Sequence, residues 1–178
     1  MVQPARQSDG NRLGSRLLSR AHSVSGWFAR RSRIERPPTT WIHEFAREAS
    51  TRMVFDGSSV KPVWSPDGTQ LIIAATRGGI FDLVRNAANG AGKEEVLLKS
   101  DAFKFPWDIS RDGRWLLYGN EDRKTKEDLW LLPLGGDHRP EPFLVTDYRE
   151  TDGVFSPEAR FIAKALGTSA SPFRSRPL

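Results

Sequence analysis

The residues of this chain that could support catalysis or bind a metal are few. It has three histidines, His22, His43 and His138, and no cysteine, which excludes thiolate chemistry and disulfide bonds. His43-Glu44 begins like the metalloprotease pattern of two zinc-binding histidines four residues apart, but position 47 is Arg. The sequence has no Gly-x-Ser-x-Gly nucleophile motif, no phosphate-binding loop and no His-Arg-Asp kinase set. We therefore expect no enzymatic activity, no cofactor and no metal.

A second candidate for metal binding is the segment from Asp108 to Gly113. Asp108, Ser110 and Asp112 fall at positions one, three and five of a calcium-binding loop, and Gly113 falls at position six. The twelfth position, where a glutamate should complete the site, is Gly119, and the flanking residues are typical of strands rather than helices. A turn explains the same residues, so we favour a turn over a calcium site.

The turn interpretation leads to an internal repeat. Ser65-Pro66-Asp67-Gly68 recurs 45 residues later as Ser110-Arg111-Asp112-Gly113, and 46 residues after that as Ser156-Pro157-Glu158-Ala159. Phe81-Asp82-Leu83 is matched in the next unit by Glu127-Asp128-Leu129. A fixed period of 40 to 50 residues is typical of repeat architectures.

Each unit contains the pattern of four short strands. In a type I turn, Ser accepts local hydrogen bonds, Pro fixes φ at the second position and Gly tolerates the fourth, so the motif predicts a strand reversal. Apolar runs and turn residues then indicate three more strands after each reversal. In the first unit these are 71–74, 80–85 and 95–98, and in the second they are 115–118, 128–134 and 142–145.

These residues resemble a known family. Residues 62–68 with the strand that follows, and Asp128-Leu129-Trp130 in the next unit, resemble the WD-like repeats of TolB-type β-propellers. Residues 93–118 and 128–163 are similar to the propeller region that follows the kinase domain of some bacterial serine/threonine kinases, and related blades cap prolyl oligopeptidases. The resemblance implies an all-β fold, a partial β-propeller of four-stranded antiparallel blades. The motif residues, for which we expect structural roles, are Trp64, Ser65, Pro66, Asp67, Gly68, Ser110, Asp112, Gly113, Asp128, Trp130, Ser156 and Pro157.

The repeats predict the organisation of the chain. We expect a disordered, Arg- and Ser-rich tail over 1–38, propeller repeats over 39–165 and an irregular tail over 166–178. The repeats divide into a half blade (39–56), two blades (57–101 and 102–147) and a half blade (148–165). These three blade-equivalents cannot close a ring of four to eight blades. Two alternatives follow: a fragment of a longer propeller, or a homodimer in which the half blades of two copies complete a six-bladed ring, the number that TolB-like propellers have.

The net charge of +5 comes from the N-terminal segment. Residues 1–38 carry a charge of +6, and the rest of the chain carries −1. The repeats therefore lack the excess of positive charge that binds the phosphates of nucleic acids. We expect no nucleic-acid partner for the folded region. No apolar run is long enough for a membrane span or a signal peptide.

The aromatic residues and the fold class together suggest a function. Five tryptophans lie in predicted strands, where we expect core packing rather than ligand stacking: Trp41, Trp64, Trp107, Trp115 and Trp130.

The propeller class favours a non-enzymatic module for protein or peptide interaction and sensing. The alternative is an accessory propeller of a larger enzyme, either a kinase sensor region or a peptidase gating domain, with catalysis encoded elsewhere.

Overall fold

The computed structural model of the chain describes residues 39–53, 58–76, 79–122 and 126–165. This part contains twelve strands and no helix. The strands are β1 (Trp41–Glu44), β2 (Ala49–Arg52), β3 (Ser58–Trp64), β4 (Gln70–Thr76), β5 (Phe81–Ala87), β6 (Glu95–Leu98), β7 (Phe103–Ile109), β8 (Trp115–Asp122), β9 (Lys126–Pro133), β10 (Glu141–Leu144), β11 (Thr151–Phe155) and β12 (Ile162–Ala165). The all-β prediction is confirmed. The tails predicted over 1–38 and 166–178 lie outside the described residues.

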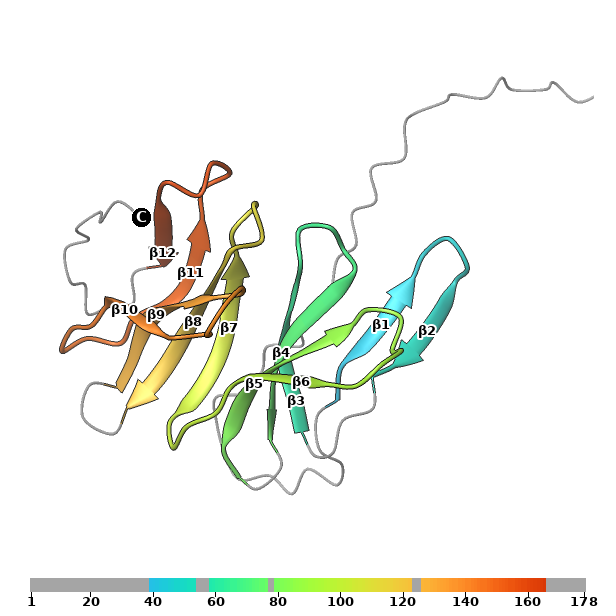
Figure 1. Ribbon diagram of the computed structural model, residues 1–178, viewed down its shortest axis with the longest axis horizontal. Coiled ribbons are helices and arrows are strands. Elements are labelled where there is room, and N and C mark those ends of the chain that lie inside the picture. The colour runs from blue at the N-terminus through green and yellow to red at the C-terminus, as the bar shows by residue number, and fades with distance from the viewer. Residues whose placement is uncertain (1–38, 54–57, 77–78, 123–125, 166–178) are drawn as a thin grey trace, which may run out of the picture.

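The strands form two four-stranded sheets flanked by two hairpins. One sheet has the order β3-β4-β5-β6 and the other β7-β8-β9-β10, and both are antiparallel throughout. The hairpins β1–β2 and β11–β12 form separate two-stranded sheets. In Figure 1 the four units follow one another across the molecule, with β1–β2 and β11–β12 at opposite ends.

The repeated motif forms the same turn in both full sheets. The Gly68 amide donates to the Ser65 carbonyl at 2.9 Å, and the Ser65 hydroxyl donates to Asp67 Oδ1 at 2.6 Å. In the second copy, Gly113 donates to the Ser110 carbonyl at 2.8 Å, and the Ser110 hydroxyl donates to Asp112 Oδ1 at 2.7 Å. The side chain of each serine and aspartate thus closes the reversal between the first two strands of its sheet.

The third copy forms the turn without its glycine or its aspartate. Ala159 donates to the Ser156 carbonyl at 2.8 Å, and the Ser156 hydroxyl accepts the Phe161 amide at 3.1 Å. Ala159 has a φ of 54°, in the left-handed region that Gly68 and Gly113 occupy at 71°. The tertiary structure therefore holds an alanine in a backbone conformation that favours glycine.

Apolar residues from both faces of the second and third strands fill the spaces between units. The two four-stranded sheets share one buried cluster, which consists of Ile72, Leu83, Leu97, Ile109, Leu116, Tyr118 and Leu132. The opposite face of β7–β10 packs against the C-terminal hairpin, and this cluster consists of Leu117, Leu129, Leu131 and Ile162. Burial of both sheet faces explains why the second strands read as continuous apolar runs.

Four of the five tryptophans expected in the core pack as predicted. Trp64, Trp107, Trp115 and Trp130 each lie against a buried apolar cluster. The prediction that Trp41 packs in the core is wrong, because the residue is 57% exposed. It lies in the β1–β2 hairpin, whose eight strand residues are almost all exposed, so position in a strand did not imply burial there.

Candidate binding surface on the first strands

The first strands of successive units lie next to each other. β3 packs beside β7, and β7 packs beside β11. Each of the three has a break in its pairing with the second strand, between Val60 and Val63 in β3, between Pro106 and Asp108 in β7, and between Thr151 and Val154 in β11. Bulges of this kind redirect side chains and are common next to functional sites.

The bulges bring a cation, an aromatic ring and a carboxylate together. Lys61 in β3 has a φ of 53°, and Asp152 in β11 has a φ of 57°. The two residues hold the same position of the repeat, because 91 residues separate them, as they separate Ser65 from Ser156. Lys61 Nζ lies 3.3 Å from the ring centroid of Trp107 and 5.3 Å from that of Phe105, both in β7. We refer to Lys61, Phe105, Trp107 and Asp152 as the first-strand surface.

The electrostatics of Lys61 are set by its neighbours. Partial burial lowers the pKa of its ammonium group, and the nearby charges of Glu127 and Asp152 oppose this shift. The stacking on Trp107 is a cation–π contact, which gains strength when the cation is partly desolvated. Lys61 as a whole is half-buried.

An ion pair with a buried carboxylate lies next to Trp107. Glu127, only 2% exposed, accepts two hydrogen bonds on Oε2 from Arg149, at 3.2 Å from Nε and 2.9 Å from Nη2. Burial raises the pKa of Glu127, and Arg149 opposes the shift. Glu127 Oε1 and Trp107 Nε1 are buried without a hydrogen-bond partner. Both atoms lie over Gly119, where a Cβ would be 2.7 Å from Trp107 Nε1 and closer still to Glu127 Oε1.

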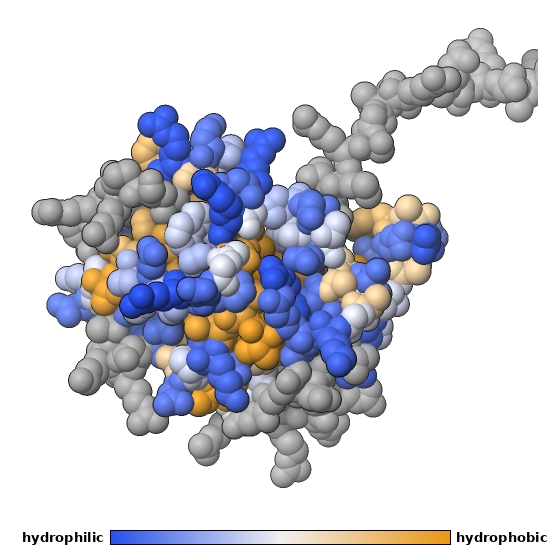
Figure 2. Space-filling view, viewed as in Figure 1, coloured by the Kyte–Doolittle hydropathy of each residue, from blue (hydrophilic) through white to orange (hydrophobic). Residues whose placement is uncertain are grey.

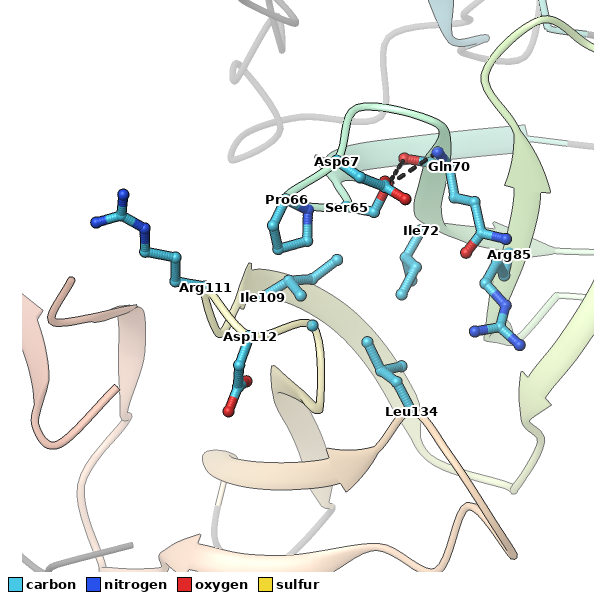
Figure 3. Close-up of a pocket in the computed structure, with 11 residues that line it drawn as sticks. Ser65, Pro66, Asp67, Gln70, Ile72, Arg85, Ile109, Arg111, Asp112 and Leu134 are labelled. Atoms are coloured by element: carbon cyan, nitrogen blue, oxygen red, sulfur yellow. Dashed lines mark hydrogen bonds between the residues drawn. The ribbon is translucent and has the colours of Figure 1, made fainter. Parts of the chain in front are cut away.

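A second concave feature, a cleft of about 300 Å³, lies between the first two motif turns (Figure 3). Ile72, Ile109 and Leu134 line its apolar part. Its carboxylates, Asp67 and Asp112, are held inside their own turns, and Arg85 is paired with Glu95 at 2.7 Å. In the close-up, the Arg111 side chain extends away from the cavity. The charged groups of this cleft are thus mostly engaged in structural contacts.

The sequence motif residues occupy structural positions rather than one common site. Ser65, Pro66, Asp67 and Gly68 form the first turn, Ser110, Asp112 and Gly113 the second, and Ser156 and Pro157 begin the third. Trp64 and Trp130 pack on separate clusters. Asp128 is buried at the start of β9 and accepts the Thr146 amide at 3.3 Å. The turn residues of the first two copies meet only across the cleft.

The first-strand surface was not predicted from the sequence. The motif pointed to the turns, and Trp107 was predicted only as a core residue. The available signal was the pair Lys61 and Asp152, two charged residues at the same position of the repeat.

The candidate metal residues do not converge. Within the described ranges, no group of three or more histidines, aspartates or glutamates is placed to hold a metal ion. Asp108, the first residue of the calcium pattern, accepts the backbone amides of Ile109 and Phe155 instead, at 2.9 Å and 2.8 Å. In the same ranges, no helix has the length and apolar character of a membrane span.

Comparisons with known proteins give the fold. No protein-family model matches the chain, and no curated protein matches its sequence. Among solved structures, it is similar to TolB from Acinetobacter baumannii, with a TM-score of 0.62 and 14% identity over 77% of this chain and 34% of that one. It is also similar to a putative TolB from Agrobacterium tumefaciens, with a TM-score of 0.57 and 22% identity over 70% of this chain and 48% of that one.

The chain therefore spans less than half the length of these TolB structures. The resemblance to kinase-linked propellers stays a prediction. With its successive four-stranded antiparallel sheets, the chain has the fold of part of a TolB-like β-propeller.

Proposed function

We propose that this chain is a non-catalytic propeller module that binds a protein or peptide segment through the first-strand surface. The observation that carries the proposal is the position of Lys61, a partly exposed residue whose ammonium group lies 3.3 Å from the Trp107 ring centroid. A cation already partly stripped of water loses less hydration when it meets a carboxylate. Aromatic rings beside it offer apolar contact area with few rotatable bonds.

The chemistry of the surface fits a peptide better than a small metabolite. Lys61, Trp107 and Asp152 come from three neighbouring strands, so the surface extends across units rather than forming one closed pocket. It carries both signs of charge next to aromatic rings. We expect an extended segment with an acidic group opposite Lys61 and an apolar side chain against Phe105.

Selection from a displayed random-peptide library tests this function. The library is selected on the wild-type chain and counter-selected on Lys61→Glu, and affinities are measured for the enriched peptides. We expect peptides enriched in acidic residues, with at least tenfold weaker binding to Lys61→Ala, whose circular dichroism spectrum should match that of the wild type. Lys93→Ala, an exposed lysine in the β5–β6 connection, is the matched control and should bind as the wild type does.

Salt dependence gives a second readout. Binding through an exposed ion pair weakens as ionic strength rises. Peptides that bind the folded Lys61→Ala variant and the wild type equally well would contradict the proposed surface.

A further inference from the structure

We propose that two copies of this chain join end to end, with β12 of each copy adding to β1 of the other, so that their hairpins complete two four-stranded sheets. The ligand of the first-strand surface plays no part in this inference, which concerns the opposite ends of the molecule. Each copy contributes two complete sheets and two half sheets, so two copies form six sheets, within the four to eight that close a propeller ring.

The first observation is that, among the described strands, β1 and β12 each have one edge without a partner strand. In both full sheets the second strand pairs on both sides, as β4 does with β3 and β5 and as β8 does with β7 and β9. Within the described ranges, β12 pairs only with β11 and β1 only with β2. An open edge exposes backbone donors and acceptors that favour pairing with another strand.

The second observation identifies β1–β2 as the outer half of a sheet, that is, as its third and fourth strands. In the first full sheet, Asp82 near the start of the third strand β5 lies 3.6 Å from Nζ of Lys104, a buried residue of the next first strand. Ser59 holds the position of Lys104, 45 residues earlier, and it is also buried. Ser59 Oγ lies 3.1 Å from Thr40 Oγ1 and accepts the Thr40 amide at 3.0 Å. Thr40 therefore marks the start of a third strand, and β1–β2 are a third and a fourth strand.

The third observation identifies β11–β12 as the inner half of a sheet, that is, as its first and second strands. These strands are joined by the Ser156 turn, the third copy of the reversal that joins β3 to β4 and β7 to β8. β11 lies beside β7 as β7 lies beside β3. Lys164 of β12 forms a buried ion pair with Glu150, the residue before β11, and the Glu150 amide donates to the Glu127 carbonyl of β9 at 2.7 Å, which attaches this half to the second full sheet. An inner half at one end and an outer half at the other are complementary.

Part of the exposed apolar surface lies on the same two hairpins. Eight large hydrophobic residues of the described part are exposed, and four of them flank or belong to the hairpins: Trp41, Phe45, Val154 and Phe161. In Figure 2 the end of the molecule where Figure 1 places β1–β2 shows pale orange surface mixed with blue, while the deepest orange lies near the middle of the molecule. Because the hairpins lie at opposite ends of one chain, a second copy is the occupant that offers both missing halves at once.

The register of the new pair follows from the two complete sheets. Ile72 pairs with Arg85 in one sheet, and Leu117 pairs with Leu131 in the other. Ile72 and Leu117 each lie seven residues after the motif serine, and Ala163 has the same spacing from Ser156.

The partners in the third strand follow in the same way. Arg85 and Leu131 each lie three residues after the repeat aspartate of that strand, which is Asp82 or Asp128, as His43 lies three residues after Thr40. Ala163 of one copy should therefore face His43 of the other.

Disulfide trapping tests this pairing without background, because the chain has no cysteine. His43→Cys and Ala163→Cys are purified separately, mixed and oxidised. Residues that face each other across antiparallel strands are close enough for a disulfide. We expect a covalent dimer in this mixture. Ser50→Cys, on the outer strand β2 and paired with His43 within the hairpin, is the matched control and should not cross-link to Ala163→Cys.

Light scattering of the unmodified chain gives the second measurement. We expect a mass near twice 20.0 kDa. Three outcomes would each overturn the inference. They are a folded monomer, equal cross-linking of Ser50→Cys and His43→Cys to Ala163→Cys, and an intrachain disulfide in a monomeric chain that carries both His43→Cys and Ala163→Cys. Loss of peptide binding by Lys61→Ala leaves this result unchanged, so the failure of the proposed function and the failure of the dimer are distinguishable.

Discussion

The backbone amide of Phe155 in β11 donates a 2.8 Å hydrogen bond to Asp108 Oδ2 in β7. The two strands belong to different sheets, so a side chain from one sheet takes the place of ladder pairing to the next. Burial raises the pKa of Asp108, and its hydrogen bonds to the Phe155 and Ile109 amides oppose the shift. This contact fixes the C-terminal hairpin against the rest of the molecule.

We predict that Asp108→Ala weakens this attachment by about 1 to 3 kcal/mol, because a half-buried amide loses its acceptor. The loss should appear as faster amide hydrogen exchange in β11 and β12, while β4 and β5 keep their protection. Asp108→Asn keeps one acceptor oxygen, which can serve the Phe155 amide or the Ile109 amide but not both, and it removes a charge that burial disfavours, so its loss should be smaller than that of Asp108→Ala. Equal effects of both variants would contradict the assigned role of the acceptor.

A second prediction concerns the alanine in the third turn. Ala159→Gly should stabilise the chain by about 1 kcal/mol, because φ is 54° there and glycine adopts this region without a Cβ penalty. Urea unfolding measures the change. Gly68→Ala is the reciprocal variant: its Cβ would meet nothing within 4 Å, so only the conformational cost remains, and we expect about 1 kcal/mol of destabilisation. A destabilised Ala159→Gly variant would argue against the third turn as described.

A third prediction follows from the carboxylate of the second turn. Hydrogen bonds from the Ser110 hydroxyl, the Arg114 amide and the Arg114 side chain lower the pKa of Asp112 from 3.8 to about 2. Because the folded value lies below the unfolded one, the carboxylate stabilises the fold above about pH 4, and the contribution disappears as pH falls through 2. Unfolding of Asp112→Asn and wild type should therefore differ clearly at pH 6 and converge between pH 4 and pH 2. A difference independent of pH would exclude this role.

The strands were predictable because the repeat encodes them redundantly. The Ser-Pro-Asp-Gly turn fixes a reversal through hydrogen bonds within a few residues, so local sequence suffices to locate it. Apolar runs such as Leu71–Ala74 then follow from burial on both sheet faces. Even the degraded third copy forms the turn, because Ser156 supplies the same acceptor as Ser65 and Ser110.

The candidate site was less accessible to sequence reasoning because it depends on packing between units. Lys61 reaches Trp107 only because β3 lies beside β7 and a bulge gives Lys61 a positive φ, and neither condition has a local sequence signature. Glu127 lies in a charged stretch of the sequence, which is typical of solvent-exposed residues, yet it is buried and paired with Arg149, which lies 22 residues away. Partners so distant in sequence are set by the sheet arrangement and not by local pattern.

The last prediction separates the tryptophans by their packing. Trp130 lies against the cluster shared by the two full sheets, and its removal leaves a cavity there. We therefore expect Trp130→Ala to lower the free energy of unfolding by about 3 kcal/mol. Trp41→Ala is the comparison, because the Trp41 side chain is 57% exposed and meets no core cluster within the described residues. In the isolated chain at low concentration it should cost well under 1 kcal/mol. If two copies pair through β1, the cost of Trp41→Ala should grow with protein concentration while that of Trp130→Ala stays constant, because only the first depends on association.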